Sequence, residues 1–127
     1  MPMINFEEKH PNQNQPLIGI VGVCASGKST LISGLNELGM RTRHIAQEHS
    51  YVKDMWKRIT NPDVLIFLDA SYEVTIHRRQ LDWTRAEWEE QQRRLLHARQ
   101  NADLYVNTDN LGISEVINQV VRYLSQL

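Results

Sequence analysis

Apolar and polar residues divide the chain into two kinds of segment that alternate. Apolar runs without a polar alternation cover 17–21 and 63–70, and weaker strand candidates cover 41–46 and 103–108. Such runs are typical of parallel strands that are buried on both faces. Segments with apolar residues at helical spacing separate them. The pattern therefore predicts an α/β fold in three layers (α/β/α), with a short parallel sheet of about four strands.

The predicted helices have recognisable ends. Their expected ranges are 28–38, a short piece within 49–60, 71–80, 84–100 and 114 onward. Gly39 follows the first helix in a C′ position, and Ser71 and Ser114 are the expected N-caps of the third and fifth helices. Thr84 and Glu87 have the spacing of a capping box. These signals set the boundaries of the elements.

Length, charge and cysteine content narrow the class of protein. The 127 residues carry a formal net charge of -1, which predicts one domain over 16–127, preceded by a flexible tail over 1–15. A near-neutral charge predicts neither nucleic acid nor a membrane as a partner. The N-terminus has no apolar stretch typical of a signal peptide. The single cysteine, Cys24, excludes an internal disulfide bond and favours a cytoplasmic location.

The strongest chemical signal is the segment GVCASGKS, from Gly22 to Ser29, which follows a predicted strand and opens a predicted helix. Its spacing fits G-x-x-x-x-G-K-[ST], in which backbone N–H groups and the helix N-terminus hold phosphate oxygens. The lysine binds the β- and γ-phosphates of a nucleoside triphosphate, and the hydroxyl ligates Mg²⁺. The expected ATP-binding residues are Gly22, Cys24, Ala25, Ser26, Gly27, Lys28, Ser29 and Thr30. The alternatives are a glycine-rich turn with a solvated lysine and, for Cys24, a redox switch rather than a small residue in a tight loop.

Further candidates come from the ends of the predicted strands, since ligands of parallel sheets bind outside the carboxyl ends. Gln47, Glu48 and His49 follow the second strand, and Asp69 ends the third. Glu48 is expected to activate an acceptor hydroxyl or to hold the metal through water; the alternative is a cap on the next helix through Ser50. Asp69 is either an outer ligand of Mg²⁺ or a helix cap.

Arginines are concentrated after the third strand. They are Arg78, Arg79, Arg85, Arg93, Arg94 and Arg99. Phosphoryl transfer requires positive charge around the transferred group, but pairs such as Glu89–Arg93 and Glu90–Arg94 also fit a solvated helix face. Trp83 can cover a base or simply pack.

Over roughly 16–127 the chain resembles the P-loop kinases of small molecules and nucleotides, the group of adenylate kinase, shikimate kinase and dephospho-CoA kinase. The segments that carry the resemblance are GVCASGKST, LIFLDASYEVTIHRR and RRLLHARQNADLYVNTDN. The resemblance implies that Arg78 packs against adenine, that Arg94 is a second arginine of the lid, and that Asp109 and Asn110 lie beside the base. It also implies five strands, so one strand–helix unit is missing before LIFLDA, and the lid around 80–84 is short.

Three functions therefore compete. The first is a kinase that transfers the γ-phosphate of Mg-ATP to an unidentified small acceptor, with Lys28, Glu48, Arg78 and Arg94 as catalytic residues and Ser29 and Asp69 at the metal. The second is a nucleotide-binding regulatory module without catalysis. The third is a slow NTPase that acts with a protein partner. A strand exposed by the missing unit also makes a homodimer a candidate assembly.

Overall fold

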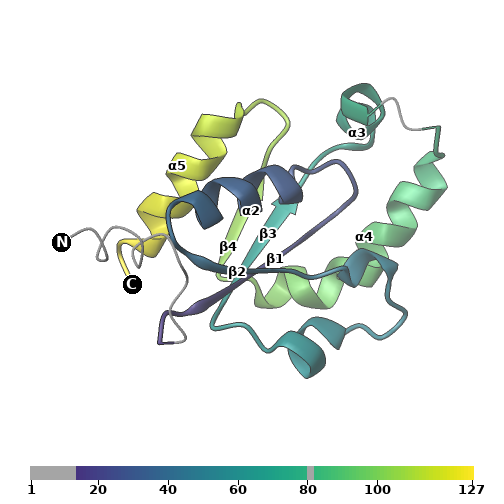
Figure 1. Ribbon diagram of the computed structural model, residues 1–127. Helices are drawn as coiled ribbons and strands as arrows, with labels where there is room; N and C mark the ends of the chain where they lie inside the picture. Colours follow the sequence, from purple (N-terminus) through teal and green to yellow (C-terminus); the bar gives the residue numbers. More distant parts are fainter. Residues whose placement is uncertain (1–13, 80–81) are drawn as a thin grey trace.

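A parallel sheet forms the centre of the molecule. The computed structural model describes residues 14–79 and 82–127. The four strands are β1 (Leu17–Gly22), β2 (Arg41–His44), β3 (Val64–Asp69) and β4 (Leu104–Asn107). They lie in the order β2-β1-β3-β4, all parallel, with Ile20 opposite both His44 and Ile66 (Figure 1). The predicted short parallel sheet is therefore confirmed.

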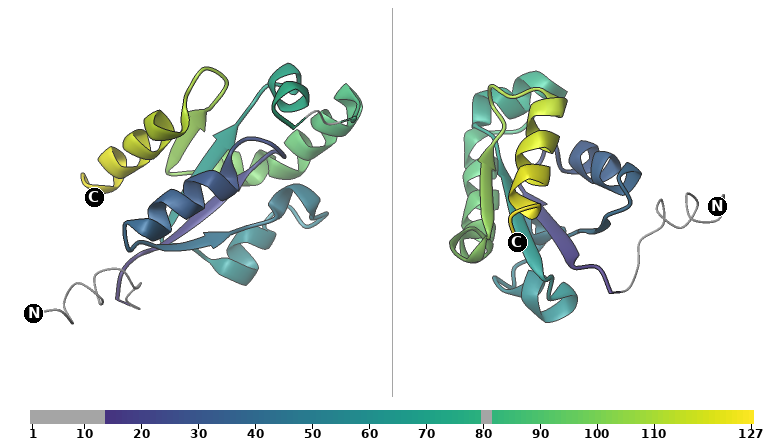
Figure 2. Two further views of the ribbon diagram at one scale, coloured as in Figure 1. Left: turned by 45° about the horizontal axis from the view of Figure 1, so that its top comes forward. Right: turned by 90° about the vertical axis from the view of Figure 1, so that its left-hand side faces the viewer.

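Helices cover both faces of this sheet. They are α2 (Lys28–Glu37), α3 (Tyr72–Arg79), α4 (Arg85–Asn101) and α5 (Ile113–Leu124), with a 3₁₀ turn η1 (Gln47–His49) and a π-helical turn η2 (Trp56–Thr60). Figure 2 shows α2 and α5 on one face and α4 on the other. The arrangement is thus three-layered, as the alternation of segments predicts.

Each face of the sheet has its own hydrophobic core. Residues of β1, β3 and β4 that point toward α2 and α5 pack with Leu31, Leu35, Val116 and Val120. The opposite face packs with Leu95 and Ala98 of α4 and with Trp56 of η2. Strand residues alternate between the two faces of the sheet, and both faces are covered. Every residue of β1 and β3 is therefore buried, which explains the continuous apolar runs in the sequence.

Most predicted helix ends are confirmed. Thr84 and Glu87 form the capping box at the start of α4, Ser71 Oγ accepts a hydrogen bond from Val74 N at 3.3 Å, and Gly39 has the left-handed conformation of a C′ residue. The prediction for Ser114 is wrong. It lies inside α5, whose N-cap is Gly112, and Gly112 N donates to Glu115 Oε1 at 2.8 Å.

The segment between β2 and β3 differs from the single short helix expected there. It contains η1 and η2 instead, because the buried side chain of Gln47 serves backbone groups of this segment. Gln47 Nε2 donates to Val52 O at 2.8 Å, and Gln47 Oε1 accepts from Trp56 N at 2.8 Å. A left-handed Asn61 ends η2 before Pro62. Gln47 Nε2 also donates to Arg94 O at 3.4 Å, so its side chain connects this segment to α4.

β2 is an outer strand of the described sheet. Arg41, Arg43 and His44 place basic residues along this edge, and such charge disfavours pairing with another strand. None of the helices within 14–79 and 82–127 is long and apolar enough to cross a membrane. The proposed tail over 1–15 and the lid around 80–84 fall mainly or partly outside the described residues.

Candidate nucleotide site

The loop that connects β1 to α2 has the tight geometry that its glycines predict. Gly27 has φ = 105°, a conformation that strains residues with a side chain. A Cβ atom on Gly22 would lie 2.1 Å from Leu68 O, so the loop passes directly against β3. Ala25 also has a positive φ of 65°. The loop is therefore held in a strained, curled conformation, which is common at ligand-binding sites.

The N-terminus of α2 is open. No side chain caps it, and its first turn contains no acidic residue. The side chains of Ser29 and Thr30 lie at this end, where both residues are exposed. Unsatisfied N–H groups and the positive end of the helix dipole therefore form an anion-binding position.

Lys28 is buried beneath the loop rather than solvated. Its Nζ donates to Gly22 O at 2.6 Å and to Val23 O at 3.0 Å, and it lies 3.1 Å from Glu48 Oε2. Lys28 and Glu48 are only 7% and 3% exposed. A buried ion pair of this kind is costly to desolvate and stabilises little by itself. The sequence alternative of a solvated lysine is therefore wrong.

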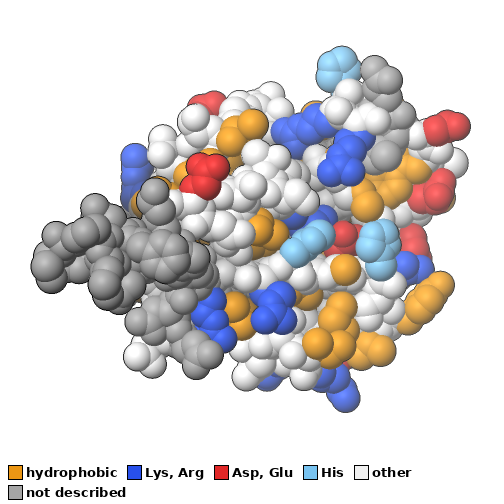
Figure 3. Space-filling model, in the orientation of Figure 1, with side chains coloured by type: hydrophobic (Ala, Val, Ile, Leu, Met, Phe, Trp, Pro, Cys, Tyr) orange, Lys and Arg blue, Asp and Glu red, His pale blue; other side chains and the backbone are white. Residues whose placement is uncertain are grey.

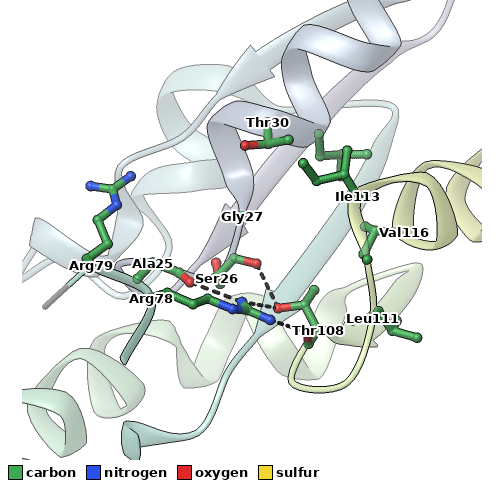
Figure 4. Close-up of a pocket in the computed structure, with 12 residues that line it drawn as sticks. Ala25, Ser26, Gly27, Thr30, Arg78, Arg79, Thr108, Leu111, Ile113 and Val116 are labelled. Carbon is green, nitrogen blue, oxygen red and sulfur yellow. Dashed lines mark hydrogen bonds between the residues drawn. The ribbon is translucent and has the colours of Figure 1, made fainter. Parts of the chain in front are cut away.

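A pocket of about 300 Å³ lies beside the loop. It opens between the start of α2, the end of α3 and the loop from β4 to α5 (Figure 4). Its lining residues are Ala25, Ser26, Gly27, Thr30, Leu31, Arg78, Arg79, Thr108, Leu111, Gly112, Ile113 and Val116. Apolar walls with a few polar groups are typical of a small-molecule site.

Arg78, at the end of α3, connects the loop after β1 to the loop after β4. Its guanidinium donates to Ala25 O at 3.2 Å and to Thr108 Oγ1 at 2.8 Å, and it also donates to Thr108 O. Figure 4 shows the guanidinium between the loop and Thr108. Arg78 therefore contacts the loop from a position 53 residues further along the chain than Ala25; its packing against adenine stays a prediction.

Arg94 lies at the other side of Lys28. It donates to Glu90 Oε2 at 3.0 Å and to Glu48 O at 3.4 Å, and its guanidinium lies 4.3 Å from the centre of the Tyr51 ring. It therefore lies beside Glu48, with its charge already paired. The expected Glu89–Arg93 pair is wrong, because Arg93 pairs with Glu90.

The carboxylate of Asp69 faces α4 and β4: Oδ1 accepts from Gln92 Nε2 at 2.8 Å and from Ala70 N at 2.9 Å, and Oδ2 accepts from the Tyr105 hydroxyl at 2.7 Å. The neighbouring Tyr105 has a raised pKa, because its hydroxyl is partly desolvated and donates to Asp69. The carboxylate oxygens of Asp69 therefore already have hydrogen-bond partners, and Ser71, not Asp69, caps α3.

Asp109 and Asn110 are absent from the residues that line the pocket. The Asp109 carboxylate accepts a hydrogen bond from Ser71 N at 2.9 Å. Their neighbour Thr108 lines the pocket instead. Its hydroxyl lies 2.8 Å from Ser26 O and 3.2 Å from Asp69 O, so it fastens the loop to the sheet.

Gln91 is a residue of this site that sequence reasoning missed. Gln91 Oε1 accepts from Cys24 N at 3.0 Å, and Gln91 Nε2 donates to Cys24 Sγ at 3.1 Å. Gln91 shares one face of α4 with Leu95 and Ala98, which are both buried. A polar residue in an apolar stripe was the available signal. Trp83, a candidate base cover, instead donates from Nε1 to Thr75 Oγ1 at 3.2 Å.

Comparison with known proteins identifies no relative. No protein-family model matches the chain, and none of the curated proteins matches it significantly. The site's chemistry therefore has to be argued from its own residues.

Proposed function

We propose that this chain is a P-loop phosphotransferase, which binds Mg-ATP on the loop 22–30 and transfers the γ-phosphate to a hydroxyl or phosphate group of a small molecule. The observation that carries the proposal is the buried Lys28–Glu48 pair, with Nζ and Oε2 3.1 Å apart. Binding a triphosphate requires the lysine, and activating an acceptor requires a nearby carboxylate. Both groups meet at the carboxyl end of a parallel sheet, where ligands of such sheets bind.

The nucleotide is expected to occupy the open end of α2 and the adjoining pocket. Lys28 and the N–H groups of the loop bind phosphate oxygens, and Arg78 packs against the base. The apolar walls of the pocket come from Leu31, Leu111 and Val116. No feature of these walls distinguishes adenine from guanine, so ATP is proposed from the resemblance.

Mg²⁺ fits this site through one protein hydroxyl. Ser29 occupies the first turn of α2, and Mg²⁺ in such sites keeps several waters and binds mainly phosphate oxygens. Asp69 does not fit, because both of its carboxylate oxygens accept hydrogen bonds on the α4 face. When bound, the ion supplies positive charge that neutralises the phosphates.

Glu48 and Arg94 are the proposed acceptor-side residues. A phosphate that draws the ammonium of Lys28 leaves Glu48 without its ion-pair partner. The carboxylate then orients an acceptor hydroxyl and accepts its proton. Arg94, next to Glu48, supplies positive charge to the transferred group.

A nucleotide-binding module without catalysis is the second candidate. It is favoured by the pairing of Arg94 with Glu90 and Tyr51, because an arginine that keeps these partners does not reach a substrate. Such a protein would bind Mg-ATP through the same loop and transfer no phosphate.

Transfer of the labelled γ-phosphate of Mg-ATP to a pooled panel of nucleosides, nucleotides and hydroxyl metabolites tests the proposal, with Lys28→Ala as the control. A labelled product that requires Lys28 is the expected result. Slow release of labelled inorganic phosphate alone would identify an NTPase instead. Binding of ATP without any release of label would identify the regulatory module.

A further inference from the structure

Three side chains with different ligand atoms meet beside the loop. Cys24 comes from the loop itself, and Glu48 and His49 come from η1. A sulfur, a carboxylate oxygen and an imidazole nitrogen from these residues all lie within 4.8 Å of one another. On the face that Figure 3 displays, histidine side chains lie beside acidic side chains. The cluster takes Cys24 from the proposed nucleotide loop and Glu48 from the proposed acceptor side.

Glu48 has a buried oxygen with no partner. Its Oε2 lies 3.1 Å from Lys28 Nζ and 3.8 Å from His49 Nε2. Its Oε1 is buried and accepts no hydrogen bond in the described part of the chain. A buried carboxylate oxygen without a donor is unfavourable by more than a typical neutral group. A cation that binds Oε1 would satisfy this oxygen while Oε2 keeps Lys28.

Cys24 and His49 are suited to complete such a site. Gln91 Nε2 donates to Cys24 Sγ at 3.1 Å and thereby orients the sulfur, in the way that neighbouring polar groups orient metal ligands. The His49 side chain is 62% exposed, so an ion can reach the cluster from solvent. Sulfur, nitrogen and carboxylate oxygen together favour a borderline-soft ion and disfavour Mg²⁺, which prefers oxygen ligands.

We propose that Cys24, Glu48 and His49 form a binding site for a divalent transition-metal ion of the zinc class. Three protein ligands leave a fourth tetrahedral position for water or an anion, as in open zinc sites. The ion and the Lys28 ammonium share one carboxylate, so their positive charges oppose each other. The site is distinct from the proposed Mg²⁺ position at Ser29, and it requires no nucleotide.

Titration of the full-length, reduced and chelator-stripped protein with Co²⁺ and Zn²⁺, in the absence of nucleotide, tests this site. Co²⁺ should give a thiolate-to-metal absorption band that saturates at one ion per chain and that excess Mg²⁺ does not remove. Zn²⁺, followed by competition with a chromogenic chelator, should displace Co²⁺. A saturating Co²⁺ spectrum without thiolate absorption would overturn the proposal.

Variants assign the ligands. Cys24→Ser and His49→Gln should each weaken Zn²⁺ binding by about tenfold or more, and Cys24→Ser should also abolish the thiolate band. His77→Gln, a control at an exposed histidine on α3, should leave the affinity unchanged. Lys28→Ala should tighten Zn²⁺ binding, because it removes the opposing charge and frees Oε2. Wild-type affinity in both ligand variants, or weaker binding in Lys28→Ala, would contradict the site.

Because the titration contains no nucleotide, its outcome is independent of the kinase test. A chain that binds Zn²⁺ and transfers no phosphate would retain the metal site and lose the proposed function. A chain that transfers phosphate and binds no Zn²⁺ would retain the proposed function and lose the metal site.

Discussion

The two sides of Lys28 are built in different ways. The proposed nucleotide side, which comprises the loop 22–30 and the pocket between α2 and α5, combines an open helix end with apolar walls. The proposed acceptor side, which comprises 47–60 and the part of α4 that carries Arg94, combines buried polar groups that are hydrogen-bonded or ion-paired, except for Glu48 Oε1. On this proposal the nucleotide side needs no broken contact to bind a ligand, whereas the acceptor side must break the Lys28–Glu48 ion pair before it can act.

The largest expected effect comes from Glu48→Gln, which removes the proposed base and keeps the size of the side chain. Turnover should fall by about 100-fold or more, while Mg-ATP affinity stays within about threefold because the amide still accepts from Lys28. Steady-state kinetics and calorimetry measure the two quantities. Glu37→Gln, at an exposed position of α2, is the matched control. Full activity of Glu48→Gln would remove Glu48 from the mechanism and leave the acceptor side without a base.

Gln47→Leu should destabilise the acceptor side more than the nucleotide side. The substitution leaves Val52 O and Trp56 N without their partner, so the free energy of unfolding should fall by about 2 kcal/mol or more. Hydrogen exchange by local opening should accelerate more at 50–60 than at 17–38, where exchange accelerates only as far as the free energy of global unfolding falls. Gln119→Leu, on the exposed part of α5, should change the free energy by less than about 0.5 kcal/mol. Equal acceleration in both segments would show that the two sides do not unfold separately.

Arg78→Ala should weaken the nucleotide side selectively. Affinity for ATP should fall by about tenfold, because the guanidinium stacks on the base and fastens the pocket through charge-assisted hydrogen bonds. Affinity for inorganic tripolyphosphate should stay the same, since the loop and Lys28 are intact. Calorimetric titrations with both ligands measure this difference, and Arg122→Ala on α5 is the control. A parallel loss for both ligands would assign Arg78 to the phosphates.

The smallest expected effect concerns Tyr105, whose pKa is raised by desolvation and by its hydrogen bond to Asp69. A raised pKa in the folded state stabilises the protein fully below the unfolded value of about 10, and this contribution is lost as pH rises through the folded pKa. Wild type and Tyr105→Phe should therefore differ by about 1 kcal/mol at neutral pH and by less at pH values above the folded pKa.

Absorbance titration of the phenols measures this late ionisation, with Tyr51→Phe as an exposed control. Mg-ATP should leave the Tyr105 titration unchanged, because Asp69 belongs to neither side of Lys28. A shift of the Tyr105 titration on addition of Mg-ATP would indicate that Asp69 takes part in the proposed metal site after all.

The sequence predicts the nucleotide side better than the acceptor side, and the reason is physical. Gly27 and Lys28 act within a local strand–loop–helix unit, so their spacing along the chain carries the geometry. The same holds for the capping box at Thr84. Gln47 acts across the fold through its own side chain, and no local pattern indicates that a glutamine will be buried.

Long-range contacts also explain why the predictions for Asp69 and Asp109 differ from the structure. Asp69 ends β3 at the expected edge, but strand alternation turns its carboxylate toward α4 rather than toward Ser29. Thr108 rather than Asp109 reaches the loop because its hydroxyl points between Ser26 O and Asp69 O. Position at the edge of the sheet was predictable, but the direction of each side chain was not.

The most direct test of the account is calorimetric titration of Mg-ATP into wild type and Lys28→Ala, with Lys57→Ala on η2 as an exposed control. Saturable binding of one nucleotide is expected in wild type and in Lys57→Ala. In Lys28→Ala the affinity should fall by about 100-fold or more, since charge-assisted bonds to phosphate are lost. Unchanged affinity in Lys28→Ala, in a protein that remains folded by circular dichroism, would contradict the assignment of this loop to phosphate.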